Sequence, residues 1–323
     1  MMKKLLKKII SVALSAVTAV AVLSFAASCK KSSDIVIGIL QVDTHNALDS
    51  SRKGFEDTLN AWAKKNGKTI EFNEQNAHGN PNNEITLADS LVSKKPDMLL
   101  GIATSSARAL AQKTTKIPVL FTAVTDPTDS EFKGANVTGT SDKAPVADQI
   151  RLIKTVVPDC KKVAFLYHKS EENSLKQVEA AKAECAKLGI ECVEKPVADE
   201  NGIQTVTESI GDDIDAVYLP TDNMISANVN AACSILNARK IPVIAAESGM
   251  CGDGNALATL GIDYYNLGVQ TAEIAIKILE KTKTPSEISF EFYNRECSVF
   301  VNEKNAAALG LSAERIQAIK DFR

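Results

Sequence analysis

Hydroxyl side chains form a run at the start of one expected helix: Thr104, Ser105 and Ser106. The backbone N–H groups at a helix start are unpaired and the helix dipole is positive there, so such a run can hold an anion. A second set supplies oxygen atoms that suit an ammonium group: Asp222, Asn223 and Glu247. The two sets together predict a site for a zwitterion, with its carboxylate at the first set and its amine at the second. The alternative is that Thr104 and Asp222 only cap helices and face water.

The remaining candidate ligand-binding residues lie in loops that follow expected strands: His45, Thr125, Asp126, Asn173, Ser174 and Ser248. In open parallel sheets, ligands bind beyond the carboxyl ends of the strands, in the loops that open the next helices. Lys169 is the one cation in these loops. A ligand carboxylate would therefore be held by hydroxyls and amides, without a salt bridge.

Short apolar runs alternate with helical patterns along most of the chain. Nine strands are expected: 35–40, 69–73, 98–102, 119–122, 162–167, 191–195, 216–219, 243–246 and 256–260. Between them apolar residues recur at helical spacing, as at Phe55, Leu59 and Trp62. Strands that read as unbroken apolar runs, separated by helices, are typical of parallel sheets covered on both faces. The sequence therefore predicts an α/β fold.

An internal repeat predicts two similar lobes. The segment from Asp97 runs through a polar loop and a helix to Lys116-Ile117-Pro118-Val119, and the segment from Asp215 runs in the same way to Lys240-Ile241-Pro242-Val243. We expect two doubly wound, Rossmann-like lobes joined by a hinge of three crossings, near 141–145, 259–264 and 288–292. The first lobe would comprise 34–143 plus 264–288, and the second 144–263 plus 289–323.

The first 28 residues are typical of a secretory signal, with lysines followed by an apolar run and small residues. Ala26-Ala27-Ser28-Cys29 resembles a bacterial lipobox, which predicts a lipid on Cys29 and a tether over 29–33. An ordinary cleaved signal or an uncleaved anchor is the alternative. In each case the folded part would work outside the cytoplasm. With the lipid it would be anchored to the cell membrane, on the periplasmic side or at the outer cell surface.

Composition narrows the classes of function. Without residues 1–28 the formal net charge falls from −3 to −7, and no basic face for nucleic acid is evident. The six later cysteines show no metal-ligand spacing, and neither GxSxG nor HExxH occurs. We therefore expect no metal, no cofactor and no catalytic residue, in a monomer that is not an enzyme. Whether the cysteines pair cannot be read from their spacing.

Several short motifs carry a resemblance to a known family. They are His45-Asn46-Ala47-Leu48-Asp49, Ala103-Thr104-Ser105, Thr125-Asp126-Pro127, Asn136-Val137-Thr138-Gly139, Asn173-Ser174, Thr221-Asp222-Asn223 and Asp263-Tyr264-Tyr265. In this order the chain resembles, over nearly its whole length, the TrpX-like substrate-binding lipoproteins of ABC transporters, which have the type I periplasmic-binding-protein fold. The family more often has Pro at the positions of Asn46 and Ser105.

The resemblance implies capture of tryptophan, phenylalanine or tyrosine by hinge closure, and delivery to an ABC permease in the membrane. The selected loops contain few aromatic rings, so a branched-chain amino acid stays open as the ligand. A nucleoside, a sugar, or a role as the partner of a sensing receptor are further alternatives.

Overall fold

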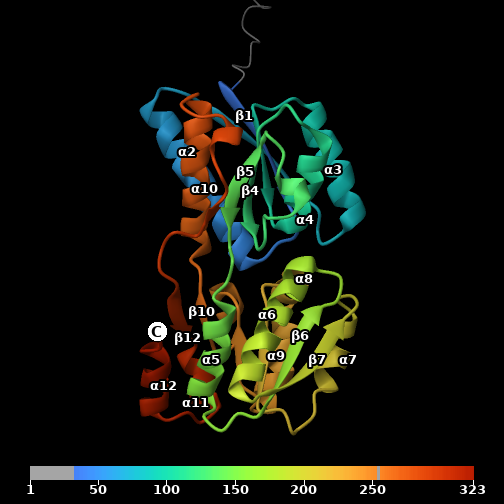
Figure 1. The fold of residues 1–323 in the computed structure, drawn as a ribbon, viewed down its shortest axis with the longest axis vertical. Helices are drawn as coiled ribbons and strands as arrows, with labels where there is room; N and C mark the ends of the chain where they lie inside the picture. Colours follow the sequence, from blue (N-terminus) through green and yellow to red (C-terminus); the bar gives the residue numbers. More distant parts are fainter. Residues whose placement is uncertain (1–32, 253–254) are drawn as a thin grey trace, which may run out of the picture. The chain divides into compact units, whose positions relative to one another are not determined.

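The computed structural model describes residues 33–252 and 255–323, and its strands form two six-stranded sheets (Figure 1). The first sheet has the spatial order β11 (Glu291–Phe292), β5 (Val137–Ser141), β4 (Val119–Val124), β3 (Met98–Ile102), β1 (Ile35–Gln41) and β2 (Ile70–Asn76). The second has the order β12 (Ser298–Val301), β10 (Ala258–Gly261), β9 (Val243–Ala245), β8 (Ala216–Leu219), β6 (Lys162–His168) and β7 (Glu191–Val197).

The two sheets repeat one topology. Both place their strands in the same doubly wound order, and the pairings are parallel except for the antiparallel pair of β10 and β12. Every residue of β3 and β4 is buried, as expected for central strands covered on both faces. The predicted α/β fold with two doubly wound lobes is confirmed.

Helices cover both faces of each sheet. In the first lobe α2 (Asn46–Lys65) and α10 (Tyr264–Leu279) lie on one side, and α3 (Pro81–Ser93) and α4 (Thr104–Lys113) on the other (Figure 1). In the second lobe one core takes side chains from α5 (Val146–Val156), α6 (Glu172–Leu188), α11 (Glu303–Ala308) and α12 (Ala313–Lys320). The opposite core takes them from α7 (Gly202–Glu208), α8 (Asn223–Ala227) and α9 (Val229–Ala238).

The third crossing lies later in the chain than the sequence predicts. We expected it within 288–292, but Glu291 and Phe292 pair with β5 of the first sheet, and Ser298 already pairs in the second. The chain therefore changes sheets between Phe292 and Ser298. A strand of two residues has no periodicity, so β11 left no signal in the sequence.

Strand β5 was also absent from the expected strands, because its sequence Val-Thr-Gly-Thr-Ser is polar. All five residues are nevertheless buried. The Thr138 hydroxyl donates to the Ile288 carbonyl at 2.9 Å, and the Thr140 hydroxyl lies 2.7 Å from that of Thr271. Since side-chain hydrogen bonds satisfy these hydroxyls, a polar segment can occupy the sheet interior.

The predicted signal over 1–28 and the predicted lipidation at Cys29 lie outside the described residues. No helix among the residues that the structure describes is long and apolar enough to cross a membrane.

Helix α10 packs against α2 at the distance of direct backbone contact. A Cβ atom added at Gly268 would lie 1.9 Å from the Ser51 carbonyl oxygen, and one added at Gly54 would lie 2.0 Å from the Tyr265 carbonyl oxygen. Side chains at these positions would push the helices apart. The contact holds the N-terminal end of α10, with Tyr264, beside the end of α2 that follows His45.

Gly268→Ala should lower the free energy of unfolding by roughly 1–3 kcal/mol, because the added methyl group overpacks a backbone contact. The matched control is Gly202→Ala in α7, where the added Cβ would make only a 3.4 Å contact with Val197 of β7. Alanine favours helix over glycine, so the control should be neutral or stabilising. Urea unfolding followed by circular dichroism measures both. Equal stability of the two variants would contradict the close contact.

Candidate functional site

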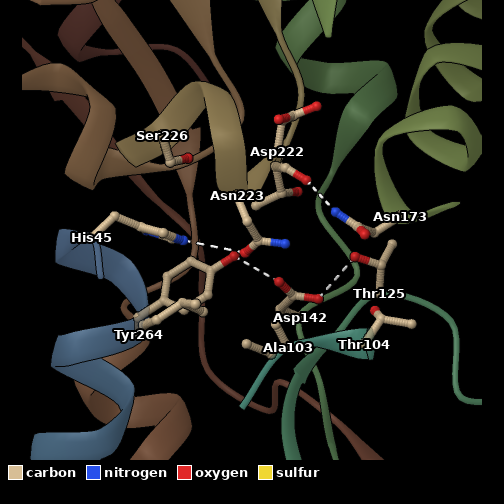
Figure 2. Close-up of a pocket in the computed structure, with 13 residues that line it drawn as sticks. His45, Ala103, Thr104, Thr125, Asp142, Asn173, Asp222, Asn223, Ser226 and Tyr264 are labelled. Atoms are coloured by element: carbon tan, nitrogen blue, oxygen red, sulfur yellow. Dashed lines mark hydrogen bonds between the residues drawn. The ribbon is translucent and has the colours of Figure 1, made fainter. Parts of the chain in front are cut away.

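A cavity lies between the lobes at the carboxyl ends of the central strands (Figure 2). Its volume is about 10 Å³. That is room for about one water molecule, so a larger ligand requires the lobes to separate. The lining residues are His45, Leu48, Ala103, Thr104, Ala123, Thr125, Asp142, Asn173, Thr221, Asp222, Asn223, Ser226 and Tyr264.

The first lobe presents the start of α4 to this cavity. The first backbone hydrogen bond of the helix runs from the Ala107 N–H to the Ala103 carbonyl, so the amides of residues 104–106 precede the helical ladder. The hydroxyl oxygens of Thr104 and Ser106 are buried without a protein partner. Ala103 has φ of 77°, a left-handed conformation that is strained for a residue with a side chain. Thr104 lines the cavity, so this end of it has an unused hydroxyl beside the first amides of α4, and Ser106 lies buried behind it.

A buried carboxyl group, Asp142, lies on the same cavity (Figure 2). It accepts hydrogen bonds from the Tyr264 hydroxyl at 2.7 Å and from the Thr125 hydroxyl at 3.1 Å. Burial raises the pKa of Asp142, and these two hydrogen bonds oppose the shift only in part. No cation is bonded to this group among the described residues, so the ionised carboxylate would gain from a bound cation.

On the second lobe, Asp222 also lines the cavity, but its oxygen atoms are already used. One accepts the Ile225 N–H at 2.9 Å, and the other accepts the His168 N–H at 2.6 Å and the Ser174 hydroxyl at 2.7 Å. Asp222 is thus the N-cap of α8, as in the alternative that the sequence left open, but it is buried and does not face water. Burial is the main cause that raises the pKa of Asp222 to about 7, and the negative charge of Glu171 is the second.

A hydrogen-bond chain joins the two lobes at the cavity. Glu171 accepts the side-chain amide of Asn223 at 2.8 Å, which leaves the Asn223 amide oxygen for His45 Nε2 at 3.2 Å. His45 therefore donates from Nε2, and its Nδ1 is buried without a partner. Burial lowers the pKa of His45, so the neutral ring is favoured. Burial works to raise the pKa of Glu171, but hydrogen bonds from His168 and Asn223 hold it below its usual value.

Charged residues form a second contact between the lobes, which we call the rim cluster: Arg108, Asp126, Asp129 and Glu131 of the first lobe with Glu172 and Lys176 of α6. The Lys176 ammonium lies 3.1 Å from both Asp126 and Asp129, and the Arg108 guanidinium lies 2.6 Å from Glu172. About a third of each side chain is exposed. Single pairs of this kind contribute little, but the network links the lobes at several points.

The structure brings six of the twelve predicted residues to the cavity: His45, Thr104, Thr125, Asn173, Asp222 and Asn223. The other six are absent from its lining: Ser105, Ser106, Asp126, Ser174, Glu247 and Ser248. Ser105 donates to Glu84, Ser174 donates to Asp222, and Asp126 is in the rim cluster. Glu247 accepts the N–H of Gly249 and the hydroxyl of Ser226, and Ser248 is exposed. Roles in ligand binding remain predictions for all twelve.

Sequence reasoning missed Asp142 as a site residue and placed Tyr264 only at the end of an expected hinge crossing. Asp142 directly follows β5, the polar strand that the sequence did not reveal. Had that strand been recognised, the rule that ligands bind after strand ends would have selected Asp142. Within residues 33–252 and 255–323 no group of three or more His, Cys, Asp and Glu side chains is placed to hold a metal ion.

Two similar α/β lobes with a polar cavity at the facing strand ends define a ligand-binding protein of the type I periplasmic-binding-protein fold. The family model described as "ABC transporter substrate binding protein" matches residues 36–319, and the chain belongs to this family.

Three relatives are informative. A "Tyrosine-binding protein" of Clostridioides difficile is 36% identical over 88% of this chain and 84% of its own length. An ABC domain from Streptococcus pneumonia in complex with L-Trp has 30% identity, a TM-score of 0.79, and coverage of 87% of this chain and 98% of its own. The ligand-free, open structure of a substrate-binding protein with adhesive properties from Clostridium difficile has 37% identity and a TM-score of 0.66. The match covers 86% of this chain and 95% of the other.

Buried carboxyl groups should make the protein less stable as the pH rises from 5 to 7.5. Burial raises the pKa of Glu84, Asp222 and Glu247 to about 7. A carboxyl group that holds its proton more tightly when folded stabilises fully below its unfolded pKa of about 4, and this stabilisation is lost as the pH rises through 7. The pKa of His168 is raised, so this residue also makes the protein less stable as the pH rises. The pKa of His45 is lowered, so His45 has the opposite effect on stability.

Urea unfolding at several pH values tests this. Glu84→Gln should reduce the slope of the free energy of unfolding against pH by up to about 1.4 kcal/mol per pH unit, because one titrating group is removed. The matched control is Glu208→Gln at an exposed position, which should leave the slope unchanged. Stability that rises with pH across this window would contradict the assignment.

Proposed function

We propose that this protein is the substrate-binding lipoprotein of an ABC importer and captures an aromatic amino acid between its lobes. The observation that carries the proposal is one cavity lined by both the donor-rich start of α4 and the buried carboxyl group of Asp142. A carboxylate suits the first and an ammonium group suits the second. A free amino acid has both groups on one carbon atom.

The proposed assignment of the amine differs from the one drawn from the sequence. There the second lobe, through Asp222, Asn223 and Glu247, would hold the amine. Asp222 already accepts three protein hydrogen bonds and Glu247 does not line the cavity, whereas Asp142 lines it and accepts only two. We therefore assign the ammonium group to Asp142 and the carboxylate to Thr104 and the adjoining amides. A bound ammonium group would favour the ionised form of Asp142.

The aromatic class is supported by the lining of the cavity and by the relatives. The rings of Tyr264 and His45 and the apolar side chains of Leu48, Ala103 and Ala123 all line it. Rings pack favourably on other rings and on aliphatic groups, so such a wall suits an aromatic side chain. The names of two relatives mention tyrosine and L-Trp as their ligands. Which aromatic amino acid this chain binds is left to the experiment.

Capture would proceed by closure of the hinge. The described structure fits the L-Trp complex better than the open, ligand-free relative, although the open relative is more similar in sequence. The narrow cavity, the His45–Asn223 hydrogen bond and the rim cluster also agree with a closed form. A ligand that contacts both lobes stabilises this form, which an ABC permease would then recognise.

Membership of the family supports a location outside the cytoplasm. We propose that residues 1–28 direct export and that the lipid on Cys29 anchors the folded part through the short tether. One acyl chain binds a membrane only marginally, so stable anchoring would need more than one chain. We further propose that the protein acts as a monomer, without a cofactor or a catalytic reaction.

Thermal unfolding of residues 30–323, refolded from denaturant to remove bound ligand, tests the ligand class. A ligand at 100 times its dissociation constant should add roughly 2.7 kcal/mol and raise the midpoint by on the order of 5–10 °C. We expect this rise with tryptophan, tyrosine or phenylalanine. A rise with branched-chain amino acids alone would overturn the aromatic class, and a rise with nucleosides or sugars alone would overturn the amino-acid site.

Asp142→Asn and Thr104→Val should each weaken binding of the amino acid found in that screen by about tenfold or more, because each removes a hydrogen bond to a charged group. Isothermal titration calorimetry measures the dissociation constants. The matched control is Ser248→Ala, which removes a hydroxyl that does not line the cavity and should leave affinity unchanged. Full affinity in Asp142→Asn, together with a loss in Glu247→Gln, would return the amine to the second lobe.

A further inference from the structure

Two cysteines meet at the corner where α6 turns into β7. Cys185 lies in the last turn of α6 and Cys192 is the second residue of β7. Gly189, with φ of 67°, ends the helix in the left-handed conformation, and the Ile190 N–H then bonds back to the Cys185 carbonyl at 2.9 Å. This C-cap reverses the chain, so β7 returns along the helix that precedes it.

The neighbouring residues fix which faces meet. Lys182, one turn before Cys185, forms an ion pair of 2.7 Å with Glu194, two residues after Cys192. Residues three apart share a helix face, and residues two apart share a strand face. The Lys182–Glu194 contact therefore places Cys185, one turn further along α6, opposite Cys192, two residues earlier in β7.

The packing agrees with this placement. Cys185 and Cys192 contact the same apolar core, while Val193 packs on the core of the opposite sheet face. A side-chain hydrogen bond between the two thiols contributes to the pKa of each, and the charge of Cys192 also raises the pKa of Cys185. Both are free thiols in this structure. Cys160 lies in the same core. Its charge raises the pKa of Cys185, but no hydrogen bond between these two residues contributes to that pKa.

We propose that Cys185 and Cys192 form a disulfide bond that ties α6 to β7, the edge strand of the second sheet, when the protein meets an oxidising disulfide. In the cell this rests on the proposed function, because an extracytoplasmic location is where disulfides form and persist. The bond itself is a property of the folded chain and can be tested apart from location and ligand.

The reaction balances as thiol–disulfide exchange. The half-buried Cys192 thiolate attacks a small disulfide such as oxidised glutathione, forming a mixed disulfide and releasing one thiolate. The Cys185 thiolate then attacks Cys192 Sγ and releases the second. The protein loses two protons and two electrons, and one oxidised glutathione becomes two reduced ones. Since burial raises the pKa of both thiols, the rate should increase with pH above neutrality.

The purified, folded chain is equilibrated with oxidised glutathione, free thiols are alkylated, and peptides are mapped by mass spectrometry with and without reductant. We expect a peptide pair joined at Cys185 and Cys192 that disappears on reduction, with Cys297 alkylated throughout. Alkylation of both cysteines in the oxidised sample, or a link from Cys160 to Cys185 instead, would overturn the proposal.

Stability gives a second readout. Closing this short loop should raise the midpoint of thermal unfolding by on the order of 5 °C in the oxidised over the reduced protein. Cys192→Ala should abolish that difference. Cys297→Ala, which removes a half-buried cysteine in the third crossing that packs on the core of the first lobe, should retain it. An unchanged difference in Cys192→Ala would also overturn the bond. Failure of this proposal would leave ligand binding intact, whereas failure of the ligand screen would leave the bond intact.

Discussion

Parallel strands bring all their carboxyl ends to one edge of a sheet, and the rest of this molecule depends on that constraint. In each lobe the loops after the central strands can project only from that edge. Thr104 follows β3, Thr125 follows β4 and Asp142 follows β5, so one edge gathers all three. The second sheet gathers Asp222 and Asn223 after β8 in the same way. Each lobe thus supplies half of a cavity, and neither half is enclosed without the other.

Several buried acids lie at this cavity or beside it. Burying an ionised carboxylate without partners is costly, so each of these groups needs hydrogen bonds or a proton. Glu171 is held as an anion by backbone and side-chain donors, whereas burial raises the pKa of Asp142, Asp222 and Glu247. Near neutral pH the free energy of unfolding is therefore lower than it would be if apolar residues occupied these positions. Such groups persist most often where a binding site requires them.

The hinge and the cavity share residues, which couples them. Asp142 directly follows β5 in the first crossing, and Tyr264 begins α10 directly after the second. The hydrogen bond between them, at 2.7 Å, ties the two crossings together beside the cavity. A ligand that draws the Asp142 carboxylate toward itself would act on the same segments that must bend when the lobes separate. Binding and closure would then be two aspects of one rearrangement.

The sequence by itself determined the α/β class, the two lobes and nine of the strands, because apolar runs and helical spacing are local patterns that burial imposes. It also selected six of the residues that line the cavity, through the rule that loops after parallel strands form sites. It did not reveal three of the twelve strands: β5, β11 and β12. The polar strand β5, satisfied by Thr271 and Ile288, and the two-residue strand β11 depend on partners more than a hundred residues away, and β12 pairs antiparallel with β10. Asp142 was missed with them. Only the tertiary structure decided how many hydrogen bonds each acid already accepts. Asp222 accepts three and Asp142 accepts two, although they are the same residue type, because folding brings different donors to each.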